Sequence, residues 1–255
     1  MTLSATALDS GVMVARSVRR SFRDPEAFFT ALMLPVILML LFVYVFGGAM
    51  STGTSYVDYV VPGLLLLCAG FGAGTTAVAV AQDMSTGIVD RFRSMPIHGS
   101  SVMVGHIAAS MARNTIATTL VIAVALLVGW RPNGSALDWV AAIALVALFI
   151  LAISWLAAAA GLLAGSTEAA NGFTMVLMFL PYVSTAFVPA DTMPSWLRGF
   201  AQHQPMTPII ETLRGLWMGT PIQGQAWWAI AWCLAIIGVS VPAAAWLFTH
   251  RTTRQ

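Results

Sequence analysis

The sequence predicts an all-α integral membrane protein with six transmembrane helices, an N-terminal amphipathic interface helix and a re-entrant pair of short helices between the fifth and sixth spans. Composition is the first reason, because 58% of the 255 residues are hydrophobic and only 9% are charged, against about 25% charged in soluble domains. A chain with so few charges cannot cover a globular surface in water. The second and third reasons are a series of long charge-free windows and one proline-rich interruption near the end.

The charge-free windows give the number of spans. A helix needs about 20 residues to cross the hydrocarbon core of a bilayer, and each window is near or above that length. The third is the shortest, and we expect it to extend backwards through His106. The six windows are 27–57, 59–82, 114–130, 139–167, 169–190 and 215–250. We expect one domain over 1–255, divided into an amphipathic helix at 1–26, spans one to five at 27–187, outer helices at 188–215 and span six at 216–250.

Arginine placement predicts the orientation, since cytoplasmic loops carry more Lys and Arg. All twelve basic residues are Arg. With both termini cytoplasmic, the inside holds Arg16, Arg19, Arg20, Arg23, Arg91, Arg93, Arg113, Arg251 and Arg254, and the outside only Arg131, Arg198 and Arg214. We therefore expect a multi-pass protein of the bacterial plasma membrane, with the first apolar run retained as a span and not cleaved as a signal peptide.

The N-terminal stretch has two chemical faces when drawn as a helix. Leu8, Val12 and Phe22 fall on one side, and the predicted surface-binding residues Arg16, Arg20 and Arg23 fall on the other. Such a helix would lie in the inner interface with its arginines near anionic headgroups. The simpler alternative is a basic flank of the first span.

The connection between the second and third spans carries a compact charged group. Asp90, Arg91 and Arg93 surround Phe92, with Gly87 before them and Pro96 after them. An aromatic side chain set among charges is suited to dock in a pocket of a soluble partner. The alternative is an ordinary basic cytoplasmic loop, which composition alone slightly favours.

The stretch between the fifth and sixth spans predicts two short helices. Asp191 or Thr192 would cap the first, with Pro194 in its first turn, and Gln204 would end it. The second would begin near Pro208, and Glu211 and Arg214, three residues apart, would pair on it.

The predicted spans carry no ladder of ionisable groups of the kind an ion-coupled transporter uses. The predicted lining is apolar and soft, which suits a lipophilic cargo. It consists of Phe71, Thr75, Met175, Met178, Phe179 and Tyr182. Lipid contact or core packing remains the alternative for each of these residues.

Two segments resemble those of type-2 ABC exporter permeases. "DMSTGIVDRFRSMPI" is similar to their segment between the second and third spans, and "FVPADTMPSWLRGFAQHQPMTPIIETLRGL" to their stretch between the fifth and sixth. The likeness is greatest to the daunorubicin/doxorubicin-resistance permeases. It implies a coupling helix formed by Gly87, Asp90, Arg91, Phe92 and Arg93, which docks on a separate ATP-binding subunit, and a connecting helix carrying Arg16, Arg20 and Arg23.

The same resemblance implies that the two short helices form a re-entrant element near the outer gate, at Phe187, Pro194, Trp196, Phe200 and Glu211. It also implies a working unit of two permeases, identical or sister chains, and two ATPases. Substrate would then move between the permeases along their second and fifth spans, so the expected function is ATP-driven export of lipophilic drugs or lipid-like compounds. Polysaccharide or glycolipid export is the alternative within the family.

Cofactors and rival classes follow from what the chain contains. It has no Lys, and a P-loop requires one, so ATP and Mg would be bound by the partner subunit, with no cofactor or metal in this chain. We expect no enzymatic activity and no nucleic-acid partner, only membrane lipids and a hydrophobic substrate. An intramembrane enzyme, a channel or secondary transporter and a lipid-binding scaffold are the rival classes. Cys68 and Cys233 lie in apolar runs and are interpreted as small hydrophobic residues.

Overall fold

The computed structural model describes residues 25–50, 55–86, 99–222 and 224–250, which are helical with no strand. The predicted connecting helix with Arg16, Arg20 and Arg23, and the predicted coupling residues Gly87 and 90–93, lie outside these ranges. The elements in order are α2 (Pro25–Leu40), η1 (Leu41–Phe46), α3 (Tyr56–Ser85), α5 (Gly99–Val128), α6 (Ala136–Leu163), α7 (Thr167–Phe179), η2 (Pro181–Val183), η3 (Ala190–Thr192), α8 (Ser195–His203), α9 (Met206–Met218) and α10 (Gln225–His250).

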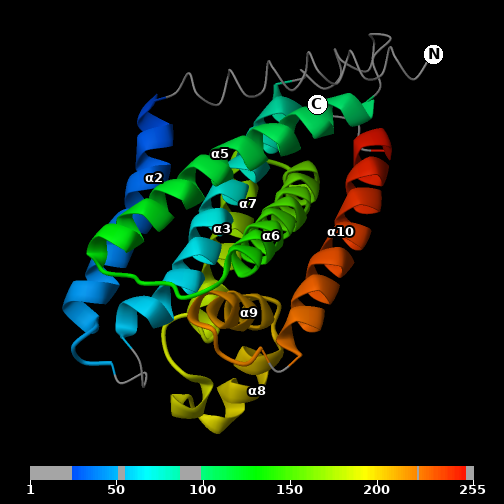
Figure 1. Ribbon diagram of the computed structural model, residues 1–255. Helices are drawn as coiled ribbons and strands as arrows, with labels where there is room; N and C mark the ends of the chain where they lie inside the picture. The colour runs from blue at the N-terminus through cyan, green and yellow to red at the C-terminus, as the bar shows by residue number, and fades with distance from the viewer. Residues whose placement is uncertain (1–24, 51–54, 87–98, 223, 251–255) are drawn as a thin grey trace.

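Four of the described helices are long and apolar enough to cross a membrane. They are α3, α5, α6 and α10, each of 26 to 30 residues, and they run between the two ends of the bundle (Figure 1). The apolar part of the first predicted span is shorter, at Met33–Phe46. The chain is therefore an all-helical multi-pass membrane protein.

The fifth predicted span is only partly helical. α7 covers 13 residues, which corresponds to about 20 Å at 1.5 Å per residue. Pro181 has no amide hydrogen to continue the ladder, and a single 3₁₀ turn follows. The next stretch, Ser184 to Phe187, is irregular and buried. Irregular backbone at membrane depth is tolerated when protein covers it, and here α3 and α9 provide that cover.

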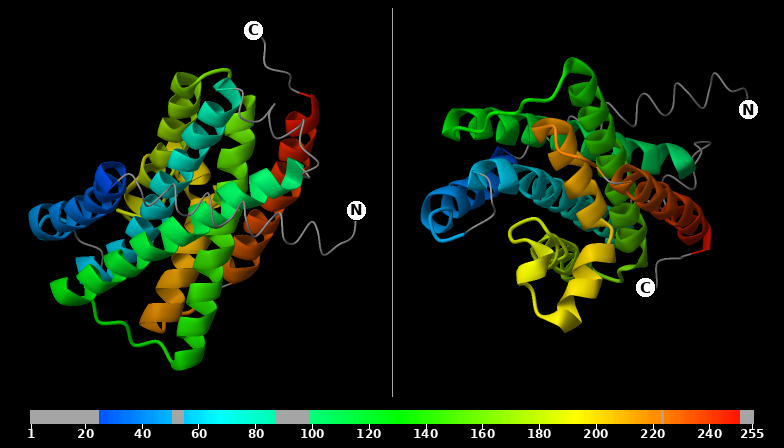
Figure 2. Two further views of the ribbon diagram at one scale, coloured as in Figure 1. Left: turned by 90° about the horizontal axis from the view of Figure 1, so that it is seen from above. Right: turned by 60° about the horizontal axis from the view of Figure 1, so that its bottom comes forward.

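α3 lies at the centre of the bundle. Every residue from Val60 to Gly70 is buried, and the helix packs against α5, α6, α7 and α9. α10 lies at the edge, with Trp227, Leu234 and Val239 exposed. Its outward surface is apolar because lipid, not water, is the expected neighbour. Figure 2 shows α10 on one side of the bundle and α2 on the other.

The start of α6 illustrates how local sequence sets an element. The Ser135 hydroxyl accepts a hydrogen bond from the Asp138 amide, and the Asp138 carboxylate accepts one from the Ser135 amide at 2.8 Å. This reciprocal pair satisfies amides that the first helical turn leaves free. It fixes α6 to begin at Ala136.

Small residues allow α3 and α6 to approach closely. A Cβ built on Gly161 would lie 2.4 Å from the Ala77 carbonyl oxygen of α3. Ala77 is itself fully buried. The atom that an added Cβ would meet belongs to the backbone, so no flexible side chain can move aside to make room. The contact therefore requires glycine at position 161.

Replacing Gly161 with Ala is expected to destabilise the bundle by about 1–3 kcal/mol, the cost typical of overpacking. The matched control is Gly238→Ala in α10, where an added Cβ meets nothing within 4 Å. Thermal unfolding of the purified protein in detergent measures both changes. Equal midpoints for Gly161→Ala and wild type would show that α3 and α6 are not in this close contact.

The two short helices between the last two apolar stretches are present, with corrected ends. α8 begins at Ser195, so Pro194 precedes the helix and does not lie in its first turn, and Asp191 and Thr192 belong to a separate 3₁₀ turn. α9 runs to Met218 and passes the expected limit at 215, because Gly219 ends it with φ of +66°. Both helices lie at one end of the bundle (Figure 1), called here the α8–α9 end.

Candidate functional site

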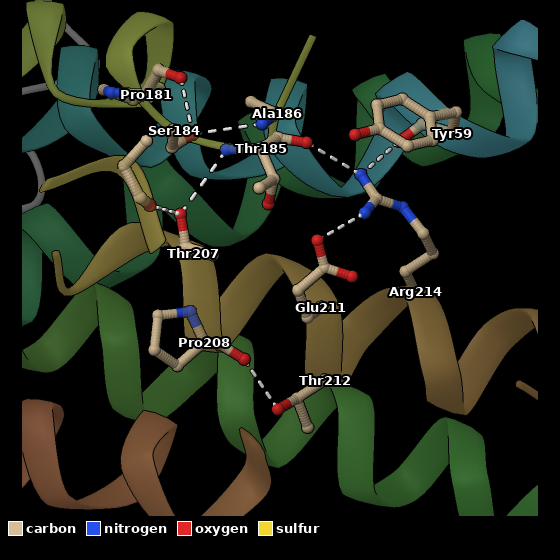
Figure 3. A network of polar contacts seen from close by, with 11 residues as sticks. Tyr59, Pro181, Ser184, Thr185, Ala186, Thr207, Pro208, Glu211, Thr212 and Arg214 are labelled. Atoms are coloured by element: carbon tan, nitrogen blue, oxygen red, sulfur yellow. Dashed lines mark hydrogen bonds and ion pairs between the residues drawn. The ribbon is translucent and has the colours of Figure 1, made fainter. Parts of the chain in front are cut away.

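Arg214 of α9 is the centre of a polar network at the α8–α9 end (Figure 3). Its Nη1 donates to Glu211 Oε1 at 2.8 Å, and its Nη2 donates to the carbonyl oxygens of Tyr59 and Thr185, each at 3.0 Å. The guanidinium also lies 3.7 Å from the centre of the Tyr59 ring, within the range of a cation–π contact. One side chain thus connects α9 to α3 and to the irregular stretch after α7. The predicted pair Glu211–Arg214 is confirmed.

A second set of hydrogen bonds fixes the turn between α8 and α9. The Thr207 hydroxyl donates to the Ala201 carbonyl and accepts from the Thr185 amide at 3.4 Å. Gln204 donates from Nε2 to the Leu180 carbonyl at 3.2 Å. These bonds satisfy backbone groups that the irregular stretch would otherwise bury without partners.

Arg198 of α8 holds the chain that precedes its own helix. Its Nε donates to the Ala190 carbonyl at 3.2 Å, and its Nη2 donates to the carbonyls of Asp191 and Met193 at 2.7 and 3.3 Å. The guanidinium thus binds backbone only, and the Asp191 carboxylate stays free of it. The turn at residues 190–193 is thereby fixed against α8.

A cavity of about 990 Å³ lies among α3, α8, α9 and α10. Its walls combine two carboxylates, one guanidinium, an imidazole and three aromatic rings. The side chains used below are Tyr59, Thr185, Asp191, His203, Glu211, Arg214, Trp228 and Trp232. The volume is at the upper end of the range found for small-molecule sites.

A row of aromatic rings runs from η1 to α7. Phe46 contacts Phe42 with ring centroids 5.5 Å apart, Phe42 stacks on Phe187 at 4.3 Å, and Phe187 stacks on Tyr182 at 5.0 Å. Tyr182 then meets Phe179 at 6.2 Å. The row brings the predicted path residue Tyr182 against the predicted gate residue Phe187, and Phe179 contacts Tyr182.

The remaining predicted path residues lie on α3 and α7, which pack together. Thr75 and Met175 are exposed, and Phe71 and Met178 are half-buried. Met175 and Phe179, four residues apart on α7, are 63% and 62% exposed. Their role in a path stays a prediction, but the structure places them where a neighbouring subunit or lipid would touch them.

The structure does not bring the predicted gate residues together. Phe187 is buried in the aromatic row, and Glu211 is held by Arg214. Pro194, Trp196 and Phe200 are exposed on and beside α8. Their grouping as one gate stays a prediction, because some of these residues are buried or paired and the others are exposed.

Sequence reasoning missed a polar face on α5, directed at α3 and α6. Its members recur at spacings of four, three and one, the pattern of a helix face. His106 Nε2 lies 3.2 Å from Asp83 Oδ2, and Arg113 Nη2 donates to the Thr76 hydroxyl at 2.9 Å. The other members on α5 are Ser110 and Asn114, and the Ser110 hydroxyl lies 2.8 Å from the Ser154 hydroxyl of α6.

This polar face also corrects the position of Arg113. The sequence prediction put it near the inner surface at the start of a helix, but α5 begins at Gly99 and continues to Val128, so Arg113 lies near its middle. The prediction included Arg113 in the backward extension of the third span, but it placed Arg113 in the first turns of that helix because the charge-free window began after it.

Comparison with known proteins decides the family. The family model described as ABC-2 type transporter matches residues 10–218, well over half of the chain. The chain belongs to the ABC-2 type transporter family. This ABC-2 chain is 29% identical over 198 residues to the daunorubicin resistance ABC transporter permease protein DrrB1 of Streptomyces coeruleorubidus, a match covering 77% of the chain and 70% of the relative.

Two further relatives of the ABC-2 chain come from strains of Mycobacterium tuberculosis. Each carries the name "Probable doxorubicin resistance ABC transporter permease protein DrrC" and is 25% identical over 232 residues. The matches cover 90% of this chain and 84% of each relative. The resemblance seen in the two sequence segments therefore extends along most of the chain.

Proposed function

We propose that this chain is the permease subunit of an ATP-driven exporter that moves lipophilic drugs or lipid-like compounds out of the cell. The similarity to drug-resistance permeases over most of the chain carries this proposal. Polysaccharide or glycolipid export is the alternative cargo. The exposed Met175 and Phe179 side chains favour an apolar cargo, because soft thioether and aromatic groups repack around varied shapes.

The proposed topology has six spans with both termini in the cytoplasm of a bacterial cell. α2 with η1 and α7 would be the first and fifth spans beside the four long helices. α8 and α9 would form a re-entrant pair at the outer surface. Two observations support this arrangement: the exposed indole of Trp196, a residue type that favours membrane interfaces, and the buried irregular backbone between α7 and α8.

The energy would come from a separate subunit that binds ATP and Mg. This chain has no Lys and so lacks the residue a P-loop uses to hold phosphates. The segment with Asp90, Arg91, Phe92 and Arg93 connects α3 to α5 and is the proposed docking site for that subunit. The arginines of the N-terminal stretch would contribute a second contact.

The translocation path would run between two permeases, along α3 and α7. α7 exposes Met175 and Phe179, and a second permease packed against them would shield cargo from the surrounding lipid. Either a second copy or a sister chain would serve.

The polar face of α5 supports a second candidate, an ion-coupled transporter. Asp83 and His106 are adjacent and shielded, and buried ionisable groups inside a bundle often carry protons. In an exporter, Asp83 and His106 would have only the structural role of joining α3 to α5. The test must therefore distinguish transport driven by ATP from transport driven by an ion gradient.

Reconstitution with the cognate ATP-binding subunit tests the proposed function. The purified chain alone is expected to hydrolyse no ATP, and vesicles holding both proteins should expel a fluorescent lipophilic drug when ATP is added. A partner whose P-loop Lys is replaced by Ala is the control and should give no efflux. Drug movement driven by a proton gradient without the partner would instead establish the ion-coupled transporter.

A further inference from the structure

The cavity at the α8–α9 end has an excess of negative charge. Asp191 and Glu211 supply two carboxylates against the one guanidinium of Arg214, which leaves a net charge of −1 with His203 neutral. The cavity wall therefore attracts cations more than anions, and the attraction is strengthened where protein limits access of water.

Arg214 is largely committed within the fold, and only its buried Nε lacks a hydrogen-bond partner among the described residues. Its Nη1 and Nη2 bond to Glu211 and to two backbone carbonyls, and its face covers the Tyr59 ring. An incoming phosphate or carboxylate would have to displace these contacts while facing two carboxylates. The arrangement excludes a phosphate headgroup as the preferred occupant.

The carboxylates keep free capacity. Only Oε1 of Glu211 contacts Arg214, and Oε2 makes no hydrogen bond with any residue in the described ranges. Arg198 reaches the backbone carbonyl of Asp191, and the Asp191 carboxylate has no ion-pair partner among the described residues. Thr185 adds a hydroxyl that is buried and has no hydrogen-bond partner in the same part of the chain, with its side chain on the side where Glu211 lies (Figure 3).

Two indoles of α10 also line the cavity. Trp228 and Trp232 are four residues apart on α10, so they share one side of the helix. Both line the cavity and are also 64% and 36% exposed. The cavity therefore opens beside α10 at the bundle surface, where indoles favour the membrane interface. Indole faces also attract organic cations.

We propose that this cavity binds an amphipathic organic cation, with its charged group near Asp191 and Glu211 and its apolar body against Trp228 and Trp232. If the chain is the exporter subunit proposed above, the cavity is a release site from which cationic cargo leaves sideways past α10. The ammonium group of an ethanolamine lipid has the same chemistry, so the source of the cation must be tested as well.

Tetraphenylphosphonium is a suitable probe, because tetraphenylborate has the same shape and the opposite charge. Equilibrium dialysis of the full chain in phosphatidylglycerol nanodiscs, without any ATPase, gives the affinity for each ion. Comparing variants for one ion at a time removes the difference in lipid partition between the two ions.

Asp191→Asn is expected to weaken tetraphenylphosphonium binding about tenfold, equivalent to about 1.4 kcal/mol. It should leave tetraphenylborate binding unweakened. Glu168→Gln is the matched control, because it removes an exposed carboxylate that is not part of the cavity wall, and it should change neither affinity. An Asp191→Asn protein that binds the cation as tightly as wild type would overturn the proposal.

The aromatic wall has its own matched pair. Trp228→Ala is expected to weaken tetraphenylphosphonium binding about fivefold through loss of the cation–π contact. Trp227→Ala should have no effect, because Trp227 is 78% exposed and does not line the cavity. Equal losses in both variants would mean that the cation binds to lipid-facing indoles and not in the cavity.

Lipid composition separates the two sources of the cation. Adding phosphatidylethanolamine to the nanodiscs should leave tetraphenylphosphonium affinity unchanged if the cavity serves cargo. If phosphatidylethanolamine competes with tetraphenylphosphonium, the assignment to cargo is overturned and the cavity is instead a binding site for the lipid headgroup. Failure of cation binding with intact ATP-driven efflux would refute only this inference, whereas cation binding without such efflux would refute the exporter.

Discussion

Replacing Arg214 with Ala is expected to destabilise the protein by about 3–5 kcal/mol, because it leaves two buried backbone carbonyls without donors, at about 1–3 kcal/mol each, and removes the partner of the Glu211 carboxylate. The Arg214 side chain is only 12% exposed, and it makes three hydrogen bonds to groups on three separate parts of the chain. Its loss leaves the carbonyls of Tyr59 and Thr185 buried without these donors. Each unsatisfied group adds a desolvation cost.

Thermal unfolding and elution from a sizing column measure the effect. Glu211→Gln should cost less, because the two backbone contacts of Arg214 survive. Arg131→Ala is the matched control at the same end of the bundle, since Arg131 is exposed and its side chain donates only to nearby carbonyls of Leu126 and Trp130. An Arg214→Ala protein that unfolds at the wild-type temperature would show that the network does not hold α9 to α3.

The contrast between Glu211 and Tyr59 shows what the sequence could predict about this network. The pair Glu211–Arg214 follows from helical spacing alone. The contact of Arg214 with Tyr59 joins residues 155 positions apart, and no local pattern specifies such a contact. Only packing of α9 across α3 creates it, so this half of the network could not be predicted from local sequence.

Helix ends show the same division. Gln204 was predicted to end the first short helix, and α8 does end at His203 with Gln204 as its C-cap. The ends of α7 near Pro181 and of α9 at Gly219 were not predicted, although a missing amide and a left-handed residue act locally. The limit expected at 215 was wrong, because the charge of Arg214 was taken to mark the end of the outer helices. Arg214 instead pairs with Glu211 inside the fold, and α9 continues to Met218.

The polar face of α5 has a spacing that can be detected in the sequence, but a search for charge-free windows does not detect it. His106, Ser110 and Arg113 recur at helical spacing, and the sequence alone displays that spacing. Their partners Thr76 and Asp83 lie seven residues apart and so share a face of α3, but nothing in the sequence indicates that this face meets α5. Periodicity predicts a polar face, but only tertiary packing identifies what it meets.

Replacing Phe92 with Ala is expected to abolish ATP-driven efflux and leave the membrane part folded. The physical reason is that movement of the segment that holds Phe92 would be transmitted to the rest of the bundle through α3. In the sequence this segment joins α3 to α5. The end of α3 and the start of α5 that flank it lie at the end of the bundle opposite α8 and α9 (Figure 1), and α3 packs against α5, α6, α7 and α9. A force applied at this connection would therefore reach α9 and the cavity beside it through the most buried helix of the bundle.

The measurement is drug efflux from vesicles that contain the variant and its ATP-binding subunit, together with the amount of subunit that co-purifies. An aromatic anchor in a pocket often contributes about 2 kcal/mol or more to association, which corresponds to roughly thirtyfold in affinity, so the pair should separate during purification. Ser94→Ala, two positions away, is the matched control and should retain both association and efflux. Normal efflux by Phe92→Ala would place the docking site elsewhere, with the basic N-terminal stretch as the next segment to test.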